Sequence, residues 1–332
     1  MKRALALAAA LLVLLPVLSQ ETHVLRQRKF PKTIPAGNYS GIAPLGNNRY
    51  AVVCDKSVDG FFVFHIIVDT ISGHIISADN EGFRSSGESN RDQEAVVVNP
   101  HSHHVFISGE KDNEIHEYSA DGALLAKFPM LFAKTALPNR GLESLTYDTS
   151  THSFFTTTEA PLKGDSVIRI QQLDSLLRPC RQFVYRLDAP KHRKKRRNVV
   201  VNGVSELCAL GDGRLLVMER EIHMPALKTG ASVRVSIYQT TPGVSPLTNS
   251  EGTPHRQNGI ETDTLKKTLL CQFTTRLNIF SRKFANYEGL CVAGRKVDGS
   301  IVLLLIADSQ NRYRGYMRDW MRTIILPPIS HK

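Results

Sequence analysis

Residues 94–110 read EAVVVNPHSHHVFISGE and contain one complete strand–turn–strand unit. Glu94 precedes one apolar run, a stretch of turn-forming Asn, Pro, Ser and His residues follows, and a second apolar run leads to Glu110. Short runs rich in Val, Ile and Phe that are bounded by such residues are typical of β-strands joined by a tight turn. The segment therefore predicts an antiparallel β-hairpin with an acidic residue at each end.

The same layout recurs along the chain. Further copies span residues 41–55, 143–159, 206–219 and 288–308, and the first of these has no leading acid. In an antiparallel hairpin the start of the first strand lies beside the end of the second. We therefore expect the two acids of each unit to meet at the open end of its hairpin. These acids are Asp55, Glu94, Glu110, Glu143, Glu159, Glu206, Glu219, Glu288 and Asp308.

A second pair of strand-like runs follows most units, for example at residues 114–118 and 123–128. Four strands per unit, at a period of roughly 50–60 residues, is the arrangement of β-propeller blades. Five units are visible, and the long fourth unit leaves room for another. We predict an all-β protein, a β-propeller with five or six four-stranded blades, whose inner strands gather the acids on one face around the axis.

The N-terminus has the features of a signal peptide. Lys2 and Arg3 precede the apolar run Ala4–Leu15, which is too short to span a bilayer comfortably. We predict a signal peptide at residues 1–19, a single propeller domain at 20–332, and an exported, periplasmic or extracellular protein with no membrane span after signal removal. A retained membrane anchor is the alternative.

The formal net charge of +11 is partly local, because residues 191–197 read KHRKKRR. Such a run could bind nucleic acid, anionic lipid or another polyanion, or be a solvated loop between two strands. An exported protein has little opportunity to meet nucleic acid, so we expect no nucleic-acid partner.

The chain has an odd number of cysteines and no CxxC pair, which argues against a zinc site and against a dense disulfide framework. The pattern still allows one disulfide in an oxidising compartment. The cysteines are Cys54, Cys180, Cys208, Cys271 and Cys291.

Several carboxylates that converge from different strands suit a hard divalent cation such as Ca2+, which takes oxygen ligands in flexible geometry. Arg140 and Arg220 lie beside the acids, and Arg matches the geometry of phosphate and carboxylate groups. Together they would suit metal-assisted ester hydrolysis with water as the nucleophile. The sequence contains no G-x-S-x-G, P-loop or H-E-x-x-H motif that would indicate a different reaction mechanism. Alternatively, each Arg neutralises a neighbouring acid.

Short fragments around these acids follow one another in a specific order. They are Tyr39–Ile42, Asp92–Ala95, Asn139–Leu145, Val204–Leu207, Leu215–Arg220, Asn286–Leu290 and Ala307–Asn311. Together they resemble the phytase-like family of exported bacterial proteins described as having "esterase-like activity of phytase". The resemblance implies a β-propeller with a phosphoesterase or esterase role. Ala95 and Ser144 stand where Gly is commoner, and Lys56 follows Asp55 where a further acid is usual.

Two hypotheses follow. In the first, the protein is an exported, monomeric hydrolase of a small anionic or ester substrate; Glu94, Glu143, Glu206 and Glu288 bind the cation or activate water, Arg140 and Arg220 hold the anionic group, and the other acids complete a metal-binding ring. In the second, the protein is a non-catalytic propeller that binds a ligand or partner, and its acids hold structural calcium or pair with Arg.

Overall fold

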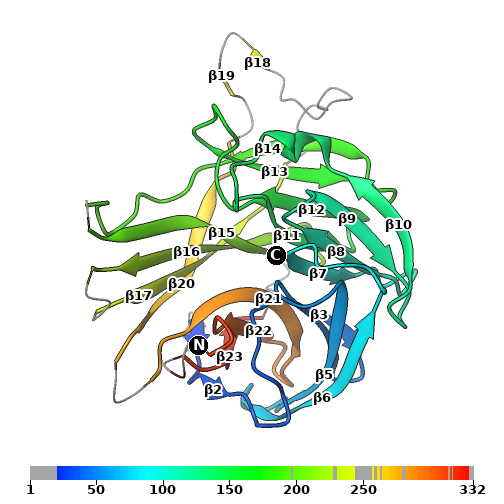
Figure 1. Ribbon diagram of the computed structural model, residues 1–332, viewed down its shortest axis with the longest axis vertical. Coiled ribbons are helices and arrows are strands. Elements are labelled where there is room, and N and C mark those ends of the chain that lie inside the picture. Colours follow the sequence, from blue (N-terminus) through cyan, green and yellow to red (C-terminus); the bar gives the residue numbers. More distant parts are fainter. Residues whose placement is uncertain are drawn as a thin grey trace, which may run out of the picture.

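The computed structural model describes residues 21–195, 197–226, 230–243, 256–257, 260–261, 264–278, 282–312, 315 and 317–328. The predicted signal peptide lies outside these residues. Within them, the strands form five antiparallel blades, each built on four strands. The innermost strands β3, β7, β11, β15 and β21 contact one another in a closed ring, as Figure 1 shows. The protein is thus an all-β propeller, and of the two predicted blade counts the structure has five.

Each blade runs from an inner strand at the axis to an outer strand at the periphery. Blade 1 has β3 (Tyr39–Gly46), β4 (Arg49–Cys54), β5 (Gly60–Val68) and β6 (Ile75–Ser85). Blade 2 has β7 (Gln93–Val98), β8 (Val105–Gly109), β9 (Glu114–Tyr118) and β10 (Leu124–Pro129). Blade 3 has β11 (Leu142–Asp148), β12 (Ser153–Thr158), β13 (Ile168–Leu173) and β14 (Pro179–Tyr185). Blade 4 has β15 (Val199–Ala209), β16 (Leu215–Met224), β17 (Ser232–Thr240) and β20 (Lys267–Arg276). Blade 5 has β21 (Asn286–Arg295), β22 (Ile301–Asp308), β23 (Trp320–Leu326) and β1 (His23–Val24).

The ring is closed by strands from opposite ends of the chain. In blade 5, β1 pairs with β23 through His23 and Ile325, and the short strand β2 (Arg28–Lys29) also pairs with β23. Figure 1 shows the N-terminal end of the described chain beside β23. Pairing with β1 and β2 gives the outer edge of β23 partners within the same chain.

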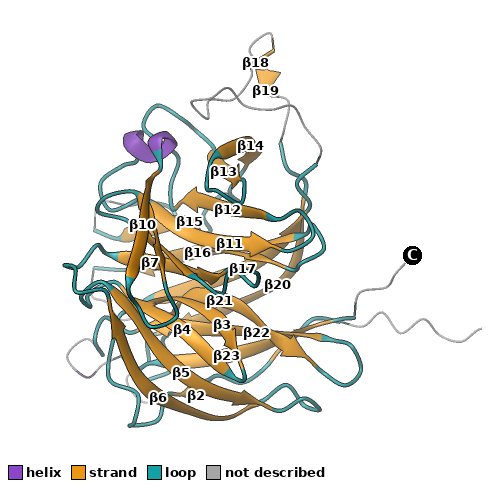
Figure 2. Ribbon diagram, turned by 90° about the vertical axis from the view of Figure 1, so that its right-hand side faces the viewer, coloured by secondary structure: helices purple, strands orange, loops and turns teal. Residues whose placement is uncertain are grey.

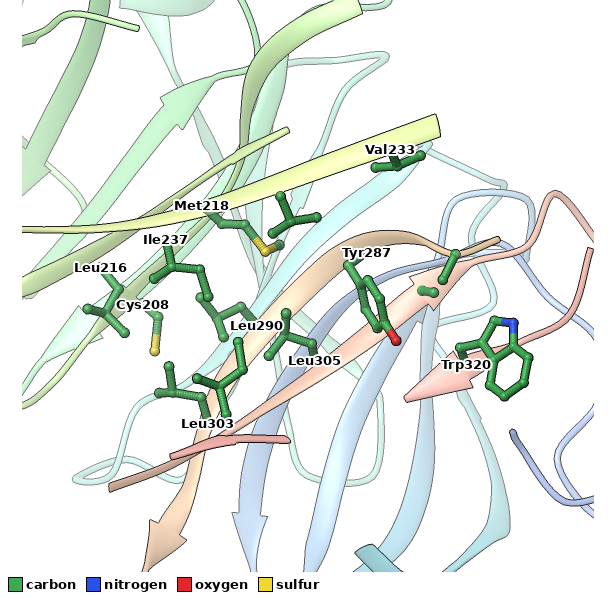
Figure 3. Close-up of a cluster of buried hydrophobic side chains, with 14 of the residues drawn as sticks. Cys208, Leu216, Met218, Val233, Ile237, Tyr287, Leu290, Leu303, Leu305 and Trp320 are labelled. Carbon is green, nitrogen blue, oxygen red and sulfur yellow. The ribbon is translucent and has the colours of Figure 1, made fainter. Parts of the chain in front are cut away.

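Apolar clusters fill the spaces between neighbouring blades. Figure 3 shows the cluster between blades 4 and 5, where Leu216 and Ile237 lie beside Leu290 and Leu303. Four further clusters occupy the other joints of the ring. Each blade is therefore covered on both faces, which explains why its strands read as nearly continuous apolar runs rather than as strict alternation.

Helical structure is scarce in the described part of the chain. Figure 2 shows the 3-10 helix η1 (Leu131–Thr135) and the separate pair β18 (Arg256–Gln257) and β19 (Ile260–Glu261) at the periphery. No helix among the described residues is long and apolar enough to cross a membrane. Cys54, Cys208, Cys271 and Cys291 are free thiols in this structure.

Candidate functional site

A β-bulge interrupts strand pairing near the start of every inner strand. In blade 3 the register between β11 and β12 shifts from Leu142 to Ser144, so that Glu143 is the extra residue. Such a bulge changes the direction of a side chain from the one that it would have in a regular strand, where side chains alternate between the two faces. The residues at this position in blades 1 to 5 are Ser40, Glu94, Glu143, Ser205 and Glu288.

The end of the second strand contributes a further residue per blade. In blade 3 the backbone N–H of Glu159 donates to the carbonyl of Gly141, two residues before the bulge (3.1 Å). The same pairing recurs around the axis. The equivalent residues in blades 1 to 5 are Asp55, Glu110, Glu159, Arg220 and Asp308.

These two positions bring carboxylates from four blades to one end of the propeller axis, as the hairpin geometry predicted. Acids from different blades are near enough to perturb one another, because the pKa of Glu94 is raised first by burial and then by Glu143 and Glu288. We call this group the acid ring. Its members are Asp55, Glu94, Glu110, Glu143, Glu159, Glu288 and Asp308.

Arg220 occupies the one second-strand position in the ring that is not acidic. Its guanidinium pairs with Glu143 at 3.4 Å, with Glu159 at 3.0 Å and, at closer range, with Glu288. Only 6% of its surface is exposed. The acids raise the pKa of Arg220 although burial opposes the shift, so this side chain is a permanent positive charge that links blades 3, 4 and 5.

Two more basic side chains reach the acid ring, and both are more exposed than Arg220. Arg140 Nη1 lies 3.0 Å from Glu159 Oε2. Lys56 Nζ lies 3.0 Å from Asp55 and 2.8 Å from Asp92, and 62% of the Lys56 side chain is exposed. Among the described residues, these three cations are fewer than the carboxylates they face.

As a consequence, carboxyl groups of the acid ring have pKa values above their ordinary range. Burial and the neighbouring Glu159 raise the pKa of Glu143, although Arg220 opposes the shift. Burial also raises the pKa of Glu288 to about 8, again against Arg220 and together with Asp308. Buried carboxylates that repel one another are expected to hold protons near neutral pH unless a cation compensates them.

Blades 1 and 2 contribute a group of acids that fits a metal ion, made of two acid-ring members and the neighbouring Asp92. One carboxylate oxygen from each of Asp55, Asp92 and Glu94 lies within 4.8 Å of the others. Within the described part of the chain, Asp55 Oδ1 is buried without a hydrogen-bond partner. Three hard oxygen donors and an unsatisfied buried oxygen fit a hard divalent cation better than a nitrogen-preferring metal. Asp92 was not among the acids predicted from sequence; its place two residues before Glu94 was the available signal.

A second acidic group, on the outer part of blade 2, is less suited to a cation. Asp112, Glu114 and His116 lie close together there. Arg91 already donates to both oxygens of Asp112, at 2.6 and 3.0 Å, and His116 Nε2 lies 2.8 Å from Glu114.

Blade 4 corrects the expected placement of two acids. Glu206 lies one residue after the bulge, and its carboxylate accepts hydrogen bonds from the backbone N–H groups of Leu207 and Leu145. Glu219 lies one residue before the ring position and accepts hydrogen bonds from Tyr185 of blade 3 and from Lys267 of blade 4. The sequence pattern did not reveal this, because a shift of one residue along a strand reverses the direction of a side chain.

This placement predicts different effects for two matched substitutions. Burial raises the pKa of Glu206 well above its ordinary value, so Glu206→Gln is expected to change the free energy of unfolding by less than about 1 kcal/mol at neutral pH. Glu219→Gln removes the charged acceptor of Tyr185 and Lys267 and is expected to cost about 1.5–3 kcal/mol. Urea unfolding measures both, and equal costs would contradict the assignment.

The fold and the site together define a class: a five-bladed β-propeller with an acid ring at one end of its axis. A family model described as "Phytase-like: Esterase-like activity of phytase" matches residues 34–310. The chain therefore belongs to the phytase-like family, as the ordered fragments in the sequence indicated.

Solved structures resemble the chain only in outline, and comparison with curated proteins gives no match. A streptogramin B lyase is 13% identical, with 92% of this chain and 98% of that chain covered and a TM-score of 0.40. A virginiamycin B lyase from Staphylococcus aureus is 11% identical, with 92% and 100% covered and a TM-score of 0.38. A luciferin-regenerating enzyme is 9% identical, with 89% and 94% covered and a TM-score of 0.44. Likeness at this level carries no argument about activity.

Proposed function

We propose that the protein is a divalent-cation-dependent hydrolase of a phosphoester or another ester, with the acid ring as its active site. The observation that carries the proposal is that carboxylates outnumber basic side chains at one end of the axis in the part of the chain that the structure describes. A cluster of this kind favours binding of a hard cation such as Ca2+. The apolar N-terminal run supports the further proposal that the protein acts after export.

The contacts support separate roles for the acids, with one group binding the cation and another exchanging a proton. Asp55, Asp92 and Glu94 would hold the cation, which when bound would polarise a phosphoryl or carbonyl oxygen. Glu143 and Glu288 are candidates for exchanging a proton with water, because burial raises the pKa of both carboxyl groups, that of Glu288 to about 8.

The two arginines differ in what they can offer a substrate. Arg140 is partly exposed and pairs with Glu159, so it is the better candidate for contacting an anionic group. Arg220 is already engaged by three carboxylates. We therefore assign Arg220 a positioning role for Glu143 and Glu288 within the active site.

The contacts of Arg220 also favour a second candidate function. A guanidinium that pairs with acids from blades 3 and 5 neutralises part of the ring without any substrate. On that basis the propeller would be a non-catalytic binding module whose acids serve the stability of the fold.

Turnover distinguishes the two candidates. The purified protein is assayed against phosphomonoesters, phosphodiesters and carboxyl esters, with calcium and with chelator. We expect hydrolysis that chelator abolishes, and a fall of at least tenfold in kcat/KM for Glu143→Gln and for Glu288→Gln.

Glu88→Gln serves as the control, because half of the Glu88 side chain is exposed and its ion pair with Lys127 is long, at 3.9 Å. It should leave activity unchanged. Absence of turnover with every ester, in a protein that still binds calcium, would favour the binding module.

A further inference from the structure

Blade 4 extends beyond the acid ring on the side where the ring lies. The pairing of β15 with β16 passes the ring at Gly203 and Arg220 and continues for four more residue pairs, ending at Val199 and Met224. At the ordinary rise of a strand this extension is roughly 13 Å long. Figure 1 shows the end of β16 at the left-hand edge of the molecule. We call this part, Val199–Asn202 with Glu221–Met224, the blade 4 ribbon.

The basic run of the sequence lies at the end of this ribbon. We call the described residues of this run, Lys191–Lys195 and Arg197, the basic loop. Lys191, Arg193, Lys194, Lys195 and Arg197 are exposed. Within the described part of the chain, none of these five side chains forms an ion pair with an acid. The loop therefore presents a concentrated positive charge to solvent.

The basic loop is fixed to the ribbon by a buried acid. Glu221 is 3% exposed and accepts hydrogen bonds from the backbone N–H groups of Lys191 (2.8 Å) and His192 (3.0 Å). Arg234 pairs with the same carboxylate. The rings of His192 and His223 stack with centroids 3.9 Å apart. These contacts hold the start of the loop against blade 4, so its charges are carried on an ordered support.

Two exposed apolar side chains accompany the charges. Val199 is 51% exposed and Met224 is 39% exposed, and they are direct partners across the ribbon. A soluble polyanion needs only the positive charges, whereas an anionic lipid surface offers phosphate groups together with an apolar layer beneath them. The combination of basic and apolar side chains at one projecting edge favours the lipid surface.

We propose that the basic loop and the Val199–Met224 pair form a docking surface for an anionic lipid bilayer. Docking there turns the end of the axis that carries the acid ring towards the membrane surface. This inference does not depend on hydrolysis at the ring.

Vesicle binding tests the proposal with the full chain, so that any contribution of the N-terminal apolar run is common to all variants. We expect binding to phosphatidylcholine vesicles that contain phosphatidylglycerol, weakened by salt, and much weaker binding to pure phosphatidylcholine. The triple variant Arg193→Gln, Lys194→Gln, Lys195→Gln is expected to bind the anionic vesicles about 100-fold more weakly.

The matched control removes the same charge elsewhere. Arg49, Arg178 and Arg295 are exposed and lie near hairpin turns away from the acid ring. Changing all three to Gln should alter affinity by less than about threefold if the loop is the docking surface. An equal loss in both triple variants would show that net charge alone is responsible and would overturn the proposal.

A second variant separates lipid from soluble polyanions. Val199→Ser with Met224→Ser should weaken binding to anionic vesicles at least tenfold and leave binding to soluble polyphosphate unchanged. If this variant binds vesicles as tightly as the unmodified chain does, the apolar pair has no role and the lipid proposal fails. Melting temperatures of all variants confirm that each is folded.

Discussion

Replacing Arg220 with methionine is expected to lower the free energy of unfolding by about 3–5 kcal/mol near neutral pH. The variant keeps the volume of the side chain but removes the charge that faces Glu143, Glu159 and Glu288. Three carboxylates then remain together in a buried site, where Arg140 still pairs with Glu159. Urea unfolding in cation-free buffer measures the loss.

The loss should depend on pH with a definite sign. Burial raises the pKa of Glu288 to about 8 and that of Asp308 to about 6, so the folded protein binds protons that the unfolded chain releases above its ordinary carboxyl pKa values. Stability from these groups therefore rises as pH falls from about 8 towards about 5. Protonation removes the repulsion that Arg220 normally offsets, so the deficit of the variant should shrink over the same range.

Arg49→Met is the control for this substitution. Arg49 pairs with Glu81 on the surface, and about half of its side chain is exposed. Its loss should cost less than about 1 kcal/mol and show no comparable pH dependence. A cost for Arg220→Met as small as that of the control would mean that the acid ring does not need this cation.

Calcium is expected to raise the melting temperature by several degrees. A ligand that binds only the folded state at about 1,000 times its Kd stabilises that state by about 4 kcal/mol. Asp55, Asp92 and Glu94 provide the three neighbouring oxygens. The double variant Asp55→Asn, Glu94→Gln is therefore expected to lose the response.

The calcium response should be larger at about pH 8 than at about pH 5. Burial and the surrounding acids raise the pKa of Glu94 well above its ordinary value, so a proton competes with the cation at the lower pH. The double variant Glu81→Gln, Glu88→Gln, at two surface acids, is the control and should retain the full response. A melting temperature that is the same with calcium, magnesium, manganese and chelator would contradict the cation site.

The sequence carried enough local information to predict the ring in four of the five blades. Glu143 and Glu159 illustrate why: each directly flanks an apolar strand of one hairpin, and antiparallel pairing alone brings the ends together. The same argument misplaced Glu206 and Glu219. Blade 4 has Ser205 and Arg220 at the ring positions, and acids next to those positions give the same pattern in sequence.

What the sequence by itself determined was the all-β repeat and the gathering of most acids at the open ends of hairpins, because strand propensity and turn chemistry are local. The tertiary structure decided the number of blades, through the pairing of β1 and β2 with β23. It also decided which acids face one another and that Arg220 joins three of them. Those outcomes depend on bulges and on contacts between residues far apart in the chain, where a one-residue difference in register reverses a side chain.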